Sequence, residues 1–166
     1  VVAYGIIMYV GFIFVGTYMG YAVGSAPVIS YHYGAGNKDE LKNLFKRSLT
    51  IIIVSSVVMT LIAEIIAGYL AGIFVSYDNN LLELTIYAVS YLISGVNIFA
   101  SSFFTALNNG VVSAVISFMR MFVFQIVMIL LLPVVLGISG IWTAVIAAEV
   151  LSVVISVMFL VKNRKK

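Results

Sequence analysis

Five long stretches of apolar residues, separated by short polar segments, constrain this sequence more than any other feature. The stretches run roughly over residues 1–31, 49–76, 81–107, 111–136 and 138–161. Each has at least the ~20 residues that an α-helix needs to cross a hydrocarbon layer about 30 Å thick, and none alternates like a strand. We therefore predict an all-α membrane protein, with about five transmembrane helices in a single domain over residues 1–166.

The small number of charges supports the same prediction and excludes several classes of function. Charged residues make up 9% of the 166 residues, against roughly 25% in a soluble domain. The apolar surface must therefore face lipid or other helices. There are no cysteines, and His32 is the single histidine, which excludes disulfides and Cys- or His-rich metal sites. Nothing resembles a nucleophile elbow or a phosphate loop, so we expect no enzyme, no bound cofactor and no nucleic-acid partner.

The basic residues predict how the helices are oriented in a cell membrane. They gather after the first and the last apolar stretch: Lys38, Lys42, Lys46, Arg47, Lys162, Arg164, Lys165 and Lys166. Under the positive-inside rule, the first loop and the C-terminus of this multi-pass protein are cytoplasmic. The segment from Lys38 to Arg47 is either a short amphipathic helix on the membrane surface or a solvated basic loop.

Three ionisable residues fall within the predicted spans: Glu64, Arg120 and Glu149. Such a group costs at least ~2.5–3.5 kcal/mol at mid-depth. Arg120 and Glu149 both lie roughly 14–16 Å deep, on consecutive antiparallel spans, so they can form a pair. The pair would either make two buried charges tolerable or take part in transport.

The third span carries a stripe of polar residues spaced by three or four: Tyr87, Ser90, Ser94, Asn97, Ser101, Thr105 and Asn108. At ~100° per residue they fall within an arc of about 80°. We interpret the stripe as the lining of a cavity; hydrogen bonding between helices is the alternative. The candidate transport or cavity residues are therefore Glu64, Ser94, Asn97, Ser101, Arg120 and Glu149.

The first span predicts close helix packing and a break. Gly16, Gly20 and Gly24 lie four residues apart, a spacing that lets another helix backbone approach. Pro27 is expected to interrupt the span near its cytoplasmic end, where the freed carbonyl could serve a substrate or an ion.

Several short motifs resemble those of the multidrug and toxic compound extrusion (MATE) family. The match in order and spacing is most specific in the last two spans, where an S-x-x-R run, an LP pair, a G-x-x-G-I-W turn and an acidic residue after alanine follow one another. The motifs are Tyr33-Gly34-Ala35-Gly36-Asn37, Ser117-Phe118-Met119-Arg120, Leu132-Pro133, Gly137-Ile138-Ser139-Gly140-Ile141-Trp142 and Ala148-Glu149.

This resemblance implies a fold of twelve helices in two six-helix lobes, of which the chain would supply helices eight to twelve. The chain begins with Val1 inside an apolar stretch, so we expect a fragment whose N-terminal lobe comes from the same transporter or from a partner chain. The family implies export of drugs and organic cations in exchange for Na+ or H+. The alternatives are a flippase for lipid-linked oligosaccharides with a similar fold, and a membrane subunit that only packs against a partner.

Overall fold

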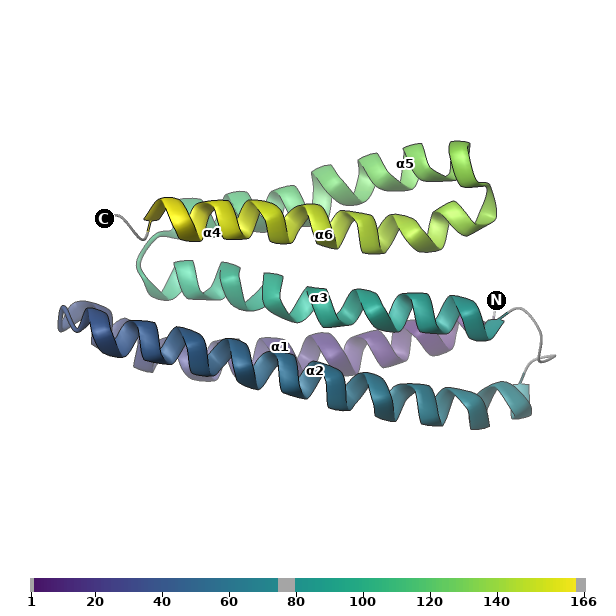
Figure 1. The fold of residues 1–166 in the computed structure, drawn as a ribbon, viewed down its shortest axis with the longest axis horizontal. Coiled ribbons are helices and arrows are strands. Elements are labelled where there is room, and N and C mark those ends of the chain that lie inside the picture. Colours follow the sequence, from purple (N-terminus) through teal and green to yellow (C-terminus); the bar gives the residue numbers. More distant parts are fainter. Residues whose placement is uncertain (1, 75–79, 164–166) are drawn as a thin grey trace.

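The computed structural model describes residues 2–74 and 80–163, and these form a bundle of antiparallel helices (Figure 1). The elements are α1 (Val2–Gly34), α2 (Lys38–Phe74), α3 (Asn80–Ala106), α4 (Gly110–Phe118), the π-helical segment η1 (Met119–Phe124), α5 (Gln125–Leu136) and α6 (Ile138–Asn163). Because α4, η1 and α5 follow one another without a break, they make one crossing. The described residues thus contain five helices long and apolar enough to span a membrane, which confirms the predicted fold class.

Helix α3 lies in the middle of the bundle (Figure 1). Helices α1 and α2 pack against one side of it, and α4 and α6 pack against the other. The α1–α2 turn, the α3–α4 turn and the C-terminal end of α6 lie at the same end of the bundle. We call this the basic end, because α2 begins there with Lys38, Lys42 and Arg47. The central position gives α3 two buried faces.

The basic segment after the first span is helical and continuous with the second span. Helix α2 begins at Lys38 and runs for 37 residues, so the predicted surface helix is the first part of α2 and not a separate element. Its start is capped by Asn37, whose side-chain oxygen accepts a hydrogen bond from the Glu40 amide at 3.2 Å. Gly36 closes the preceding turn with a φ of 68°, a conformation that favours glycine.

One expectation for the first span is wrong, and a second stays a prediction. Helix α1 runs unbroken through Pro27, so the predicted interruption is wrong. A proline removes one backbone hydrogen bond, and the intact turns on both sides keep the helix continuous. Gly16, Gly20 and Gly24 are exposed, and apart from the adjoining residues of α1 itself no heavy atom lies within 4 Å of a Cβ built at any of them. The described part of the chain therefore supplies no helix that packs on them.

Some of the predicted features lie outside the described residues. These are the basic residues Arg164, Lys165 and Lys166, and the side chains of Tyr87 and Lys162.

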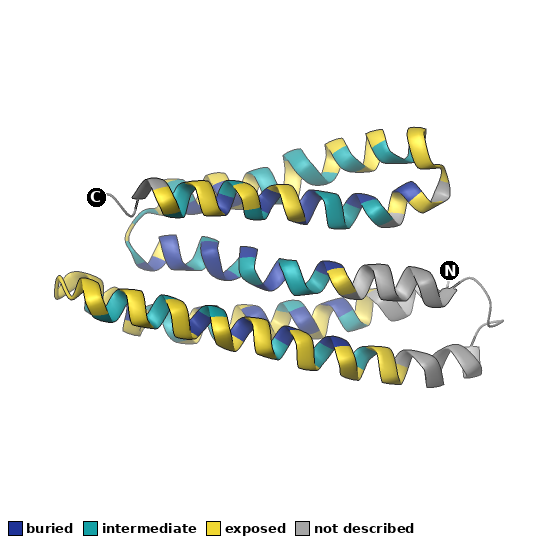
Figure 2. Cartoon of the chain, viewed as in Figure 1, coloured by how far each residue is buried: buried dark blue, intermediate teal, exposed yellow. Residues whose placement is uncertain are grey.

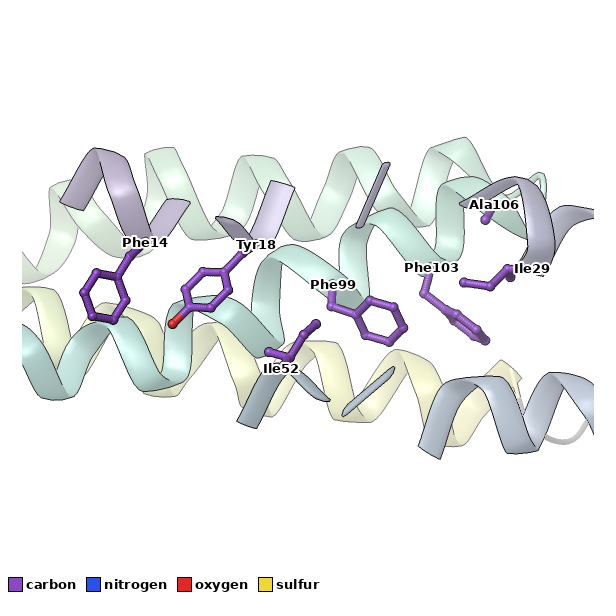
Figure 3. Packing of buried hydrophobic residues seen from close by; sticks show 7 residues of the cluster. All are labelled: Phe14, Tyr18, Ile29, Ile52, Phe99, Phe103 and Ala106. Atoms are coloured by element: carbon purple, nitrogen blue, oxygen red, sulfur yellow. The ribbon is translucent and has the colours of Figure 1, made fainter. Parts of the chain in front are cut away.

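The apolar core lies between α1, α2 and α3 (Figure 3). Its buried members are Phe14, Tyr18, Ile29, Ile52, Phe99, Phe103 and Ala106. Gly95 of α3 admits the Tyr18 ring, because a Cβ at this position would lie 3.0 Å from Tyr18 and from Ile52. The contact fixes the register of the three helices, since it sets Gly95 level with Ile52 and Tyr18.

The outer faces of α2 and α5 are exposed (Figure 2) and carry mainly branched aliphatic side chains. Examples are Ile53, Val57, Leu61 and Ile65 on α2, and Leu130, Leu131, Val134 and Val135 on α5. Such a surface suits hydrocarbon and not water, which fits a multi-pass membrane protein.

Candidate functional site

A tight turn places the fourth and fifth crossings side by side. Gly137 joins α5 to α6 as a single non-helical residue with a φ of 63°. Three residues later, Gly140 lies against the backbone of Leu132 and Pro133, and a Cβ there would collide with both. The two glycines of the G-x-x-G motif thus serve different purposes: one turns the chain, and the other lets α6 approach α5. This hairpin brings η1 opposite the middle of α6.

Arg120 of η1 and Glu149 of α6 form an ion pair across this hairpin. The Arg120 Nε atom donates to both carboxylate oxygens of Glu149 at 3.0 Å, and Nη2 donates to Oε1 at 2.8 Å. Their side chains are 16% and 8% exposed. The contact is therefore a bidentate, largely buried pair, the strong form of an arginine–carboxylate interaction. The pairing predicted from the depths of the two residues is present in the structure.

Helix α3 completes the surroundings of the Glu149 carboxylate. Ser94 donates to Oε1 at 2.8 Å, and the Asn97 side-chain amide donates to Oε2 at 2.7 Å. The same amide donates to the Glu149 carbonyl at 3.1 Å, while Ser156 donates to the Asn97 side-chain oxygen at 3.3 Å. Both carboxylate oxygens therefore have charged and neutral donors, which is what makes an ionised carboxylate tolerable away from water.

Arg120 is the second residue of the only π-helical segment in the described residues. A π-helical turn holds one more residue than an α-helical turn, and such turns are frequent at functional sites. The extra residue rotates α5 about the helix axis relative to α4. As a result, α4 and α5 present different faces to the bundle, and Arg120 lies where the change occurs.

A second polar group lies next to this site, between α3 and α4. Thr105 donates to the Ser113 hydroxyl at 2.7 Å, the Ser113 and Ser101 hydroxyls are 2.9 Å apart, and Ser101 and Ser117 are 2.7 Å apart. We call these four residues the hydroxyl chain. It begins near the α3–α4 turn at the basic end and reaches Ser117, three residues before Arg120.

The structure brings most of the predicted site residues together. Ser94, Asn97, Arg120 and Glu149 form one network, and Ser101 belongs to the adjoining hydroxyl chain. The polar stripe of α3 therefore faces α4 and α6 over these positions. Its role as the lining of a cavity stays a prediction.

Glu64 does not belong to this network. It is exposed on α2, twelve residues beyond Ile52, which lies level with Gly95 of α3. At ~1.5 Å per residue, this places Glu64 about 18 Å along the bundle from Ile52, away from the basic end.

Sequence reasoning missed the partners on α4. Ser113 was not singled out, and Ser117 was considered only as part of a motif. The spacing of Ser113, Ser117 and Arg120 by four and three residues is a one-sided polar stripe, and it could have revealed them.

The bundle of apolar crossings buries a carboxylate paired with an arginine within its spans. Charges inside a membrane are expensive and usually functional, so this arrangement is typical of membrane transport proteins. The family model described as MatE matches residues 1–131, and the chain therefore belongs to this family of membrane transporters. The match includes Ser94, Asn97 and Arg120, whereas Glu149 lies beyond it. No curated protein and no solved structure matches the chain.

Proposed function

We propose that this chain is part of a secondary transporter that exports drugs or organic cations in exchange for Na+ or H+, and that Glu149 is its coupling site. The observation that carries the proposal is the buried ion pair of Glu149 with Arg120, held by Ser94 and Asn97. A carboxylate can change its charge during a transport cycle, whereas arginine stays protonated. Arg120 is then the counter-ion that pairs with the carboxylate when no coupling ion is bound to it.

The charge balance favours a cationic cargo over an anionic one. A flippase for lipid-linked oligosaccharides moves an anionic cargo and needs positive charge in its passage. Arg120 is the one basic residue within the apolar part of the described spans, and Glu149 neutralises it. Glu64 adds a further carboxylate exposed on the bundle surface.

The proposed cycle needs a second lobe, because alternating access rocks one helical unit against another. The isolated 166-residue chain, reconstituted in liposomes, should therefore show no ion-driven uptake of ethidium. Ion-driven uptake by a monomeric chain would contradict this expectation.

The coupling role is tested by Glu149→Gln in the transporter that contains this chain, reconstituted in proteoliposomes. Glutamine has nearly the same shape but cannot become charged. We expect it to abolish ethidium efflux driven by an imposed Na+ or H+ gradient, while equilibrium binding of ethidium persists. The double variant Arg120→Met/Glu149→Gln is the control for folding, because it removes the unpaired arginine as well. Ion-driven efflux at the wild-type rate in Glu149→Gln would refute the coupling role.

A further inference from the structure

The hydroxyl chain contrasts with the serine and threonine side chains that bond only within their own helix. Hydroxyls in a membrane helix commonly bond to a carbonyl of their own helix, as Thr17, Thr50 and Ser55 do here, each bonding four residues back. Ser101, Ser113 and Ser117 instead bond to one another across two helices. Thr105 donates into the same group at 2.7 Å, and its hydroxyl also lies 3.3 Å from the Ser101 carbonyl of its own helix. Four hydroxyls thus form one continuous series of hydrogen bonds, with oxygen–oxygen distances of 2.7, 2.9 and 2.7 Å.

One end of the hydroxyl chain lies at the basic end of the bundle, and the other lies near the residues that bind Glu149. Thr105 is exposed and lies near the α3–α4 turn, at the end of the bundle predicted to be cytoplasmic. At the other end, Ser101 lies one helical turn from Asn97, and Ser117 lies three residues from Arg120. Asn97 and Arg120 both donate to the Glu149 carboxylate. One helical turn is about 5.4 Å along α3, and the hydroxyl chain makes no direct contact with the carboxylate among the described hydrogen bonds. The last step of a path to Glu149 therefore needs a water molecule, which can make two O–H···O bonds of about 2.8 Å each.

From this arrangement we propose that Thr105, Ser113, Ser101 and Ser117 form a proton path between the basic end of the bundle and Glu149. This inference rests on the proposed coupling role of Glu149 and makes the proton its coupling ion. A series of hydroxyls can pass a proton by exchanging O–H bonds, because each hydroxyl both donates and accepts. A metal cation has to move bodily between coordinating oxygens, and it would have to break the hydrogen bonds of 2.7–2.9 Å that join this series.

The transfer balances at every step. A proton from hydronium binds the Thr105 oxygen and leaves water behind, as the Thr105 O–H proton passes to Ser113, and the same exchange follows at Ser101 and Ser117. The last proton passes through the bridging water and forms an O–H bond on the Glu149 carboxylate. The net change is one hydronium converted to water and one carboxylate neutralised, after which the hydroxyls rotate back to their starting orientation.

The surroundings of Glu149 connect this step to a structural change. Arg120 is the charged group that faces Glu149 among the described residues, and α3 faces it with the neutral Ser94 and Asn97. Neutralising Glu149 removes the partner of Arg120 and leaves a lone buried cation. The ion pair then opens, so arrival of the proton changes the contact between η1 and α6.

The test compares Ser101→Ala and Ser113→Ala in the reconstituted transporter, with proton movement followed by a pH-sensitive dye inside the vesicles. Each alanine interrupts the hydroxyl chain, because Ser113 and Ser101 are its two inner members. We expect proton movement coupled to an ethidium gradient to slow by roughly tenfold in each variant, while ethidium binding is unchanged. Ser113→Thr keeps the hydroxyl and should restore the rate. Ser55→Ala is the matched control, because Ser55 bonds only within α2.

The outcomes separate this inference from the proposed function. Wild-type rates of proton movement in both alanine variants would overturn the path, and so would efflux driven by Na+ but not by H+. In either case, loss of coupling in Glu149→Gln would leave the role of Glu149 standing. Coupling that survives in Glu149→Gln would overturn the proposed function and the path together. Loss of ethidium binding in the alanine variants, restored by Ser113→Thr, would show that the hydroxyls only hold α3 against α4, which also overturns the path.

Discussion

Helix α3 buries two faces of opposite character, and they divide the bundle into two halves. Toward α1 and α2 it presents Gly95, Phe99 and Phe103, which pack among aromatic side chains (Figure 3). Toward α4 and α6 it presents Asn97 and Ser101, which lie in hydrogen-bond networks. Lipid tails are as apolar as phenylalanine, so the aromatic half is held by close packing. The polar half is held by directed hydrogen bonds and a charge pair, which can rearrange when one proton or ion is added.

The largest effect should come from breaking the ion pair of the polar half. Arg120→Met or Glu149→Gln alone should lower the free energy of unfolding by about 3–5 kcal/mol, because each leaves one buried charge without its partner. The double variant should lose less than the sum of the single losses. Chemical unfolding of the purified transporter in detergent measures this cycle. Strictly additive losses would mean that the two residues act separately despite their contact.

Close packing is best probed by adding single methyl groups at matched glycines. Gly140→Ala should cost about 1–3 kcal/mol, because the new Cβ meets the backbone of Leu132. Gly20→Ala is the control, since no atom lies within 4 Å of its Cβ position and alanine favours a helix by about 1 kcal/mol. The measurement is again the free energy of unfolding in detergent. A neutral Gly140→Ala would contradict the close approach of α5 and α6. A clear loss at Gly20 would show that another helix covers α1 in the assembled transporter.

The smallest effect is expected for single hydroxyls of the polar half. Ser113→Ala should lower the free energy of unfolding by about 0.6 kcal/mol, the average for a hydrogen bond between membrane helices. Ser55→Ala should change it less, because that hydroxyl bonds within its own helix. Such small losses keep the protein folded, so a slower proton movement in Ser113→Ala could not be attributed to unfolding. A loss of several kcal/mol would show that the hydroxyl chain is mainly a packing element.

Two features of the structure could be predicted from the sequence because simple distances determine them. The spans follow from apolar length, which the thickness of a bilayer sets. The pairing of Arg120 with Glu149 follows from equal depth on consecutive antiparallel helices, together with the high cost of a lone charge in that layer. The spans do not depend on how a helix is rotated about its axis, and for the pair the cost of a lone charge favours the rotation that brings the two side chains together.

The features that were missed depend on rotation or on backbone hydrogen bonding. Whether Ser113 meets Ser101 depends on which face of α4 turns toward α3. The π-helical turn at Arg120 depends on which backbone carbonyl each amide bonds to, and no residue type specifies it. Pro27 was expected to break α1, but a proline removes only one hydrogen bond from a helix of 33 residues. The close packing predicted at Gly20 and its neighbouring glycines stays a prediction, because these glycines face away from the described chain.

The tight turn at Gly137 also bears on how the protein enters its membrane during synthesis. Arg120 and Glu149 are 29 residues apart in the chain, and a single helical hairpin brings them together. Each would cost at least about 2.5–3.5 kcal/mol if its helix were inserted alone. Inserted together, the two helices cross the bilayer with their charges already neutralised. The last two crossings can therefore leave the translocation machinery as one electrically balanced unit, without waiting for the helices that precede them.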